Sequence, residues 1–108
     1  MLNNVILVGR LTKNIEIEEL EDGKKVTTIT LAIPRSYKNA DGVYDTDFIE
    51  CVLWNAIAQN SAEYLYKGDI VGIKGKLETK NYGDKKSKTQ VIAEKVTFLS
   101  SKKNDEEN

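Results

Sequence analysis

The stretch DFIECVLWNAIAQNSAEYLYKG, residues 47–68, constrains the fold of this chain more than any other segment. Its first eight residues alternate in the manner of a strand with one apolar face. The apolar face, which we expect to be buried, carries Ile49, Cys51 and Leu53. The opposite face carries Phe48, Glu50, Val52 and Trp54. Two aromatic rings turned away from the core indicate a second role, and stacking on nucleic-acid bases is one such role.

Strand signals outnumber helix signals along the rest of the chain. Strand-like segments occupy residues 4–11, 15–20, 26–33, 47–54, 69–80 and 89–99. Taken as about five strands with one short helix between the third and fourth, this order predicts an all-β fold. It is the order of the oligonucleotide/oligosaccharide-binding fold (OB-fold), a five-stranded Greek-key barrel.

Turn and cap residues set the expected limits of these elements. Asp22-Gly23 predicts a hairpin turn, and Pro34 is expected to end the strand that precedes it. Residues 35–47 are polar and predict a loop or an extended hairpin tip. Asn55 is expected to cap the helix, and Lys67-Gly68 to close it.

The length of 108 residues predicts one domain, which we expect at residues 1–99, followed by a short polar disordered tail at 100–108. No apolar run approaches the roughly 20 residues of a membrane span, and the N-terminus does not resemble a secretory signal. Cys51 is the only cysteine and is expected to be a buried apolar residue in a reducing cytoplasm. We therefore expect a cytoplasmic protein.

Catalysis and cofactor binding are not expected from the composition. The chain has no histidine and one cysteine, so a zinc site, the usual general base and any Ser-His or Cys-His pair are missing. No carboxylate cluster forms a recognisable metal motif, which disfavours a metal-dependent nuclease. We predict no cofactor, no metal and no enzymatic activity.

The formal net charge of -1 conceals a segregated charge distribution. Acidic residues cluster at 16–22, whereas the segment from Lys74 to Lys88 holds six lysines and two acids. In the strand at 69–80, one face is expected to be apolar, with Val71, Ile73, Gly75, Leu77 and Thr79. The other face carries Lys74, Lys76, Glu78 and Lys80, and Tyr82 continues it into the turn. Two strands thus combine a core face with an outer face of aromatic or cationic groups.

Binding of single-stranded nucleic acid needs aromatic rings for bases and cations for phosphates. The candidate stacking residues are Tyr37, Phe48, Trp54 and Tyr82. The candidate phosphate contacts are Arg10, Arg35, Lys38, Lys67, Lys74, Lys76, Lys80, Lys85 and Lys86. Alternatives stay open: Trp54 would also suit the barrel end or a subunit interface, Phe48 the core, and each lysine simple solvation.

Several segments together resemble bacterial single-stranded DNA-binding proteins. They are MLNNVILVGRLT, ITLAI, DFIECVLW, EYLYKG and IKGKLETKNY, and the form of DFIECVLW is most similar to proteins of low-GC Gram-positive bacteria or their mobile elements. The resemblance implies stacking by the four aromatics and a role at single strands in DNA replication, recombination and repair, on the nucleoid. It also implies a homotetramer, or a dimer, formed partly through the first strand, by Asn4, Val5, Ile6, Leu7 and Val8.

Three departures from that family's pattern bear on function. Glu18 and Glu78 stand where cationic or other polar residues are usual, and the acidic residues at 105–107 are not followed by the usual Pro-Phe tip. Docking of replication or recombination proteins through such a tip is therefore not expected. A naturally short form encoded by a phage or plasmid and a shortened form of a longer protein both stay open. The net acidity also motivates an alternative, an OB-fold accessory module of a primosome-like or recombination complex with weak nucleic-acid binding.

Overall fold

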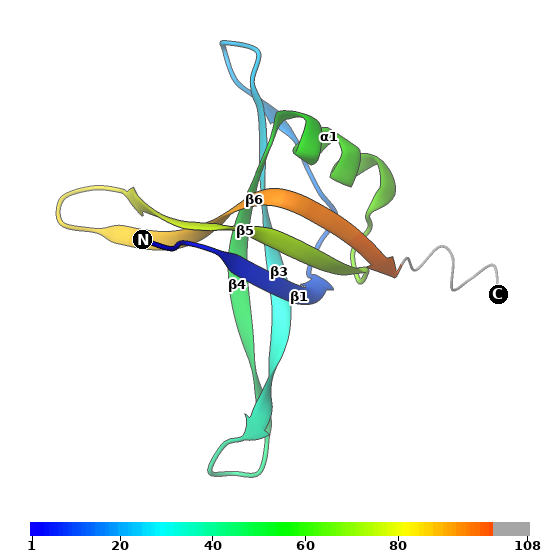
Figure 1. Cartoon of the computed structure of the whole chain (residues 1–108), viewed down its shortest axis with the longest axis vertical. Helices are drawn as coiled ribbons and strands as arrows, with labels where there is room; N and C mark the ends of the chain where they lie inside the picture. The colour runs from blue at the N-terminus through cyan, green and yellow to red at the C-terminus, as the bar shows by residue number, and fades with distance from the viewer. Residues whose placement is uncertain (101–108) are drawn as a thin grey trace.

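The structure is a computed structural model that describes residues 1–100 (Figure 1). Its elements are β1 (Val5–Leu11), β2 (Glu18–Glu19), β3 (Lys25–Lys38), β4 (Tyr44–Trp54), α1 (Asn55–Tyr64), β5 (Ile70–Asn81) and β6 (Ser87–Ser100). The predicted tail lies outside the described residues, except that Ser100 is the last residue of β6. Among the described residues, no helix is long and apolar enough to cross a membrane.

Five strands close into a barrel. Hydrogen-bonded neighbours follow the order β1-β5-β6-β4-β3, and β1 returns to pair with β3 at Arg10–Ala32 and Leu11–Leu31. The β4–β6 seam is short and parallel, with Cys51 opposite Val91 and Val52 opposite Ile92. This closure, with a single short helix between β4 and β5, confirms the predicted OB-fold.

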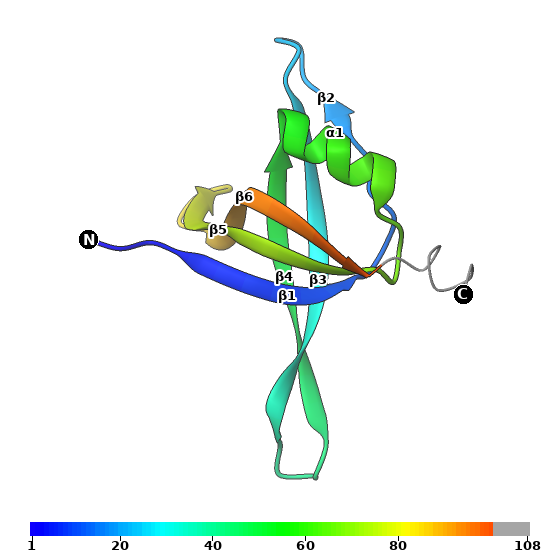
Figure 2. The same ribbon diagram turned by 45° about the vertical axis from the view of Figure 1, so that its right-hand side comes forward.

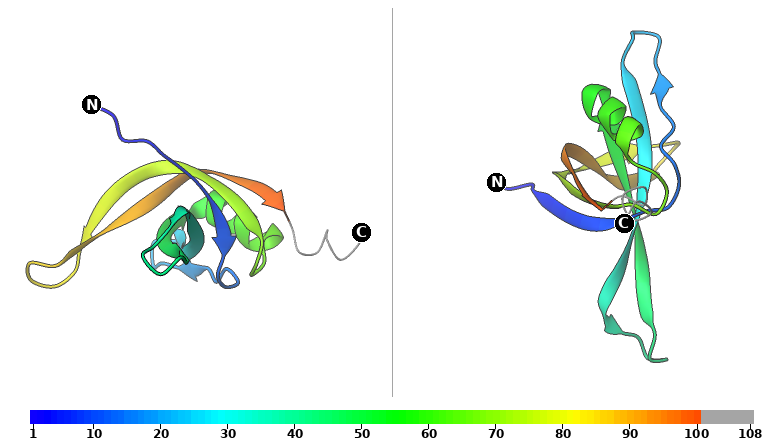
Figure 3. Two further views of the ribbon diagram at one scale, coloured as in Figure 1. Left: turned by 90° about the horizontal axis from the view of Figure 1, so that it is seen from below. Right: turned by 90° about the vertical axis from the view of Figure 1, so that its right-hand side faces the viewer.

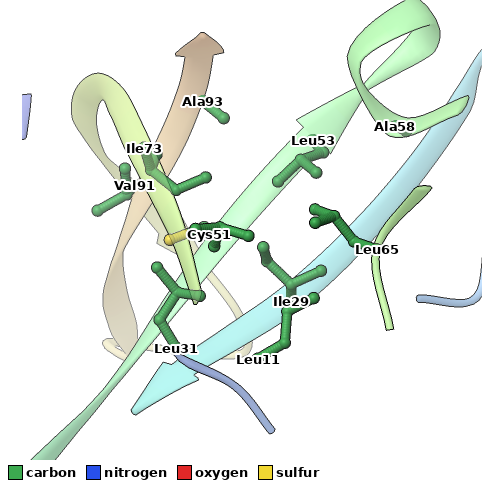
Figure 4. Close-up of a cluster of buried hydrophobic side chains, with 11 residues drawn as sticks. Leu11, Ile29, Leu31, Cys51, Leu53, Ala58, Leu65, Ile73, Val91 and Ala93 are labelled. Carbon is green, nitrogen blue, oxygen red and sulfur yellow. The ribbon is translucent and has the colours of Figure 1, made fainter. Parts of the chain in front are cut away.

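The barrel interior is filled by aliphatic side chains from every barrel strand and from the helix region. Figure 4 shows the cluster around Cys51; its buried members are Leu11, Ile29, Leu31, Cys51, Leu53, Ala58, Leu65, Val71, Ile73, Val91 and Ala93. Burial of each large aliphatic side chain contributes about 1.5–3 kcal/mol. Cys51 is fully buried, which confirms that this cysteine is a core residue, and burial raises the pKa of its thiol to about 12.

Two hairpins extend beyond the barrel. Figure 1 shows the β3–β4 turn at the lower end of the molecule and the β5–β6 turn projecting at the left. The prediction that Pro34 ends its strand is wrong, because β3 continues to Lys38 and Pro34 pairs opposite Thr46. Proline is tolerated there because β1 pairs with β3 no further than Ala32. At Pro34 the edge of β3 opposite β4 therefore has no ladder partner among residues 1–100. The extended hairpin tip expected for residues 35–47 is confirmed.

Two other predicted limits differ in the structure. The strand expected at 15–20 is reduced to β2, which pairs Glu18 with Val26 and Glu19 with Lys25. The last strand begins at Ser87, two residues before its predicted start. The short β2 is explained by its position outside the closed barrel, where only β3 offers it a partner.

Helix α1 lies beside the half of β3 and β4 that is remote from the β3–β4 turn, as the views in Figures 2 and 3 agree. Asn55 was expected to cap it, but Asn55 has a φ of 50° and its Oδ1 accepts a hydrogen bond from the Lys25 backbone N–H at 3.0 Å. The helix ends at Tyr64, before the predicted Lys67-Gly68.

The segment after α1 is held to the end of β1 instead. Lys67 N–H donates to Asn14 Oδ1 at 2.7 Å, and Gly68 N–H donates to the Leu11 carbonyl at 2.9 Å. Gly68 has a φ of 96°, which favours glycine, so its role is in this turn rather than at a helix end. These contacts close the barrel beneath the helix.

Candidate nucleic-acid interface

Strand β4 presents the predicted aromatic face to solvent. Phe48 is 65% exposed and Trp54 is 36% exposed, whereas Cys51 and Leu53 on the opposite face are fully buried. The alternative of Phe48 as a core residue is therefore wrong. The alternation fails at one position: Val52 lies on the outer face and is nevertheless buried. Its burial indicates that this outer face is hollowed around it.

The hollow is a groove of about 650 Å³. One wall comes from β2, β3 and β4, and the other comes from β5 and β6. Its lining residues are Glu18, Leu20, Val26, Thr28, Val52, Trp54, Glu78, Thr79, Lys80, Asn81, Gln90 and Ile92. The groove brings Trp54, a candidate stacking residue, together with Lys80, a candidate phosphate contact. It also brings together Glu18 and Glu78, the two acidic residues that depart from the family pattern.

Glu50, which lies between Phe48 and Trp54 on the outer face, is held by two donors from β6. Gln90 Nε2 donates to its Oε1 at 3.0 Å, and Lys88 Nζ lies 3.1 Å from the same oxygen. The hydrogen bond from Gln90, and after it the one from Lys88, lowers the pKa of Glu50 below its usual value. An ionised carboxylate is thus a fixed part of the face that carries the two rings.

The β5–β6 hairpin carries most of the candidate lysines. Lys74 and Lys80 are exposed on its outer face, and Lys76 Nζ lies 3.3 Å from Glu78 Oε2. Tyr82 is exposed where the turn begins, and Lys85 and Lys86 follow it in the turn. Leu77 was predicted in the core but is exposed, because the hairpin extends past the last β1 pairing at Gly75 and, among residues 1–100, no strand covers that face.

The β3–β4 hairpin pairs its cations with aromatic rings and carboxylates. The Arg35 guanidinium carbon lies 6.0 Å from the centre of the exposed Tyr37 ring, and Lys38 Nζ lies 5.6 Å from that of Tyr44. Arg35 Nη2 is 2.9 Å from Asp47 Oδ1, and Arg35 Nε is 3.1 Å from Asp47 Oδ2. The hydrogen bond with Asp47, and then its charge, raises the pKa of Arg35; the same hydrogen bond lowers the pKa of Asp47.

The remaining candidates lie elsewhere. Arg10 Nη1 donates to the Gly68 carbonyl at 2.6 Å, which places Arg10 beside Lys67 at the turn into β5. Lys67 lines a second groove with Lys13 and Asn14. The structure therefore groups Trp54 with Lys80 and Tyr37 with Arg35. Lys67 lines a groove that shares Glu18, Val26 and Thr28 with the groove at Trp54, and Arg10 lies beside Lys67.

Sequence reasoning missed Lys88 and Gln90. Both side chains face Glu50 from β6, and the Gln90 side chain is buried. The sequence pattern had indicated only a strand for this segment. A signal for Lys88 was present, because a turn centred near Gly83 and Asp84 places Lys88 opposite Lys80, the register that is observed. Among residues 1–100, no group of three or more His, Cys, Asp or Glu side chains is placed to hold a metal ion.

The closed barrel, the groove on its outer face and the exposed aromatic rings beside it define an OB-fold module with an open, elongated surface. The chain belongs to the single-strand binding protein family, whose model matches residues 2–99. This membership confirms the resemblance found in the sequence.

Relatives and a solved structure agree with this assignment. The chain is 44% identical to single-stranded DNA-binding protein 3 of Listeria innocua, over 96% of this chain and 68% of the relative. It is 44% identical to single-stranded DNA-binding protein A of Bacillus subtilis, over 94% of this chain and 62% of the relative. A deletion mutant of the single-stranded DNA binding protein from Thermus aquaticus superimposes with a TM-score of 0.78 at 26% identity, covering 94% of this chain and 52% of that chain. The chain thus spans about three-fifths to two-thirds of these curated relatives.

Proposed function

We propose that residues 1–99 bind single-stranded DNA without reading its sequence, and wrap and protect it during replication, recombination and repair. The observation that carries the proposal is that Phe48 and Trp54 are exposed on one face of β4 beside a groove that contains Lys80. Bases stack on such rings whatever their identity, while cations bind the phosphates. The names of the bacterial relatives support the same ligand, and none of them names an enzyme. The site of action would be the bacterial cytoplasm and nucleoid.

Titration with oligo-dT tests this proposal directly. Trp54 is the only tryptophan, so base stacking on its ring is expected to quench the protein's tryptophan fluorescence. Rising salt should weaken binding, because log K for single strands falls with a slope of about -0.7 per phosphate neutralised. We expect a shallow slope, since Arg35, Lys76 and Lys88 already contact carboxylates. Unchanged fluorescence together with no gel shift by a long oligo-dT at low salt would contradict the proposal.

We also infer that the protein forms an oligomer through β1. On the side away from β5, residues 5–9 have no strand neighbour among the described residues. Ile6 is 72% exposed and Val8 is 53% exposed on the same strand. An open, apolar edge of this kind is normally paired or covered. Pairing with β1 of a second copy would satisfy its backbone groups and bury both side chains, giving a dimer and, by a further contact, a tetramer.

The double substitution Ile6→Lys with Val8→Lys is expected to reduce the oligomer to monomers, because like charges would oppose each other across the paired strands. Light scattering coupled to size-exclusion chromatography measures the outcome. Val43→Lys is the matched control, since Val43 is comparably exposed at the β3–β4 turn, away from β1. An oligomer that survives the double substitution would exclude this interface.

A further inference from the structure

The carboxylate of Glu50 occupies a position where a bound strand would present its bases. Glu50 is two residues from Phe48 and four from Trp54 on the same face of β4, which at about 3.3 Å per residue corresponds to roughly 7 Å and 13 Å along the strand. Bases stacked on the two rings would therefore lie on either side of this side chain. The side chain is 39% exposed, so a ligand can reach it.

The contacts of Glu50 leave it one oxygen for a ligand. Both Gln90 Nε2 and Lys88 Nζ approach Oε1, and no described residue donates to Oε2. Gln90 is itself buried, which fixes the direction of the carboxylate. An ionised carboxylate only accepts hydrogen bonds. Glu50 thus offers a preset acceptor to whatever lies over β4.

A phosphate is a poor partner for this acceptor, because two negative charges repel. The cations beside it, Lys80 and Lys88, lie on the β5–β6 side of the groove. The favourable arrangement therefore places the phosphates along the β5–β6 hairpin and the base edges over β4. In that arrangement Glu50 Oε2 faces the edge of a base.

Bases differ in what they present to such an acceptor. Cytosine and adenine carry exocyclic amino groups that donate. Thymine and uracil present a carbonyl oxygen at the corresponding position, and their one edge donor, the ring N3–H, is flanked by two carbonyl oxygens that repel a carboxylate. We propose that Glu50 is a specificity-determining residue that gives this surface a preference for amino-bearing bases over thymine and uracil. The preference rests on the proposed binding of single strands and is superimposed on stacking, which does not depend on sequence.

The test compares oligo-dC with oligo-dU of equal length at neutral pH and one salt concentration. These bases differ only at the 4-position and the adjoining ring nitrogen, so phosphate contacts cancel in the ratio of their dissociation constants. A contact to one base edge is expected to make the wild-type ratio Kd(dU)/Kd(dC) about 3 to 10. In Glu50→Gln, whose amide both donates and accepts, the ratio should fall toward one, mainly through tighter binding of oligo-dU.

The control is Glu78→Gln, which removes the same charge from β5 within the groove, from a carboxylate whose Oε2 lies 3.3 Å from Lys76 Nζ. It is expected to strengthen binding of both oligonucleotides equally and to leave the ratio unchanged. A wild-type ratio at or below one overturns the inference with no variant needed. Equal gains for both oligonucleotides in Glu50→Gln, or no change, also overturn it. Equal gains would mean that Glu50 repels phosphates, and no change would mean that it only holds β6 in place. If neither oligonucleotide binds the wild-type protein, the proposed function itself fails.

Discussion

Replacing Phe48 or Trp54 with alanine is expected to weaken binding of oligo-dT by about 1–3 kcal/mol per lost stacking contact. This corresponds to roughly a fivefold to 150-fold increase in Kd. The reason is that both rings are exposed on the same face of β4, whereas two of the candidate phosphate contacts, Arg35 and Lys76, are already paired with carboxylates. Stacking should therefore supply a larger share of the affinity than phosphate contacts. Filter binding or gel shift is the suitable measurement, because Trp54→Ala removes the fluorophore.

Tyr64→Ala provides the matched control for these two substitutions. Tyr64 is an exposed aromatic on α1 whose ring centre lies 6.0 Å from that of Phe98, away from β4. Its replacement should leave the affinity for oligo-dT unchanged. Trp54→Phe should retain most of the binding that Trp54→Ala loses, since phenylalanine keeps an aromatic face. Wild-type affinity in both alanine variants would mean that β4 is not the stacking surface.

Alanine at Gly75 is expected to destabilise the fold more than any single change on the binding face. A Cβ built at Gly75 would collide with the Ile92 carbonyl oxygen and would lie 3.2 Å from Ala93 Cα. These are backbone atoms of the paired strand and cannot rotate away, so the β5–β6 ladder must separate at its irregular register there. We expect a loss of about 3 kcal/mol in the free energy of unfolding. The melting temperature should fall by roughly 10–20 °C.

Gly72→Ala tests whether this effect is specific to the position. A Cβ at Gly72 would lie 3.6 Å from Leu99 Cδ1 and 3.7 Å from Thr97 Cβ, both on β6, and these are ordinary van der Waals contacts. Its melting temperature should remain close to that of the wild-type protein in thermal denaturation followed by circular dichroism. Equal melting temperatures for the two variants would show that β6 yields easily at Ile92.

The face on which each β4 side chain lies was predictable from the sequence, because side chains of a strand alternate whatever the strand packs against. Cys51 and Leu53 are in the core and Phe48 and Trp54 are outside for this reason. The same local rule failed at Leu77 and Val52. Leu77 continues the apolar alternation into a hairpin that no other element of the described residues covers, and Val52 is buried by the walls of the groove.

Local signals also misplaced limits that depend on neighbouring strands. A proline usually ends a strand, yet Pro34 lies where β3 has a strand partner on one side only among the described residues. Asn55 has the side chain of a helix cap, but its amide oxygen bonds to Lys25 at the start of β3. In both cases the deciding factor is set by residues remote in sequence: β1 stops beside Ala32 of β3, and Asn55 contacts Lys25. Local propensity contains neither.

The sequence by itself determined the fold, the family and the outward direction of the aromatic rings, because these follow from strand periodicity and from motifs that can be read along the chain. Only the tertiary structure decided which polar side chains meet. Glu50 joins Gln90, forty residues away, and Glu18 and Glu78 line one groove with Trp54. The physical reason is that barrel closure brings β4 beside β6 and β2 opposite β5, and contacts between such distant segments depend on how the whole sheet closes.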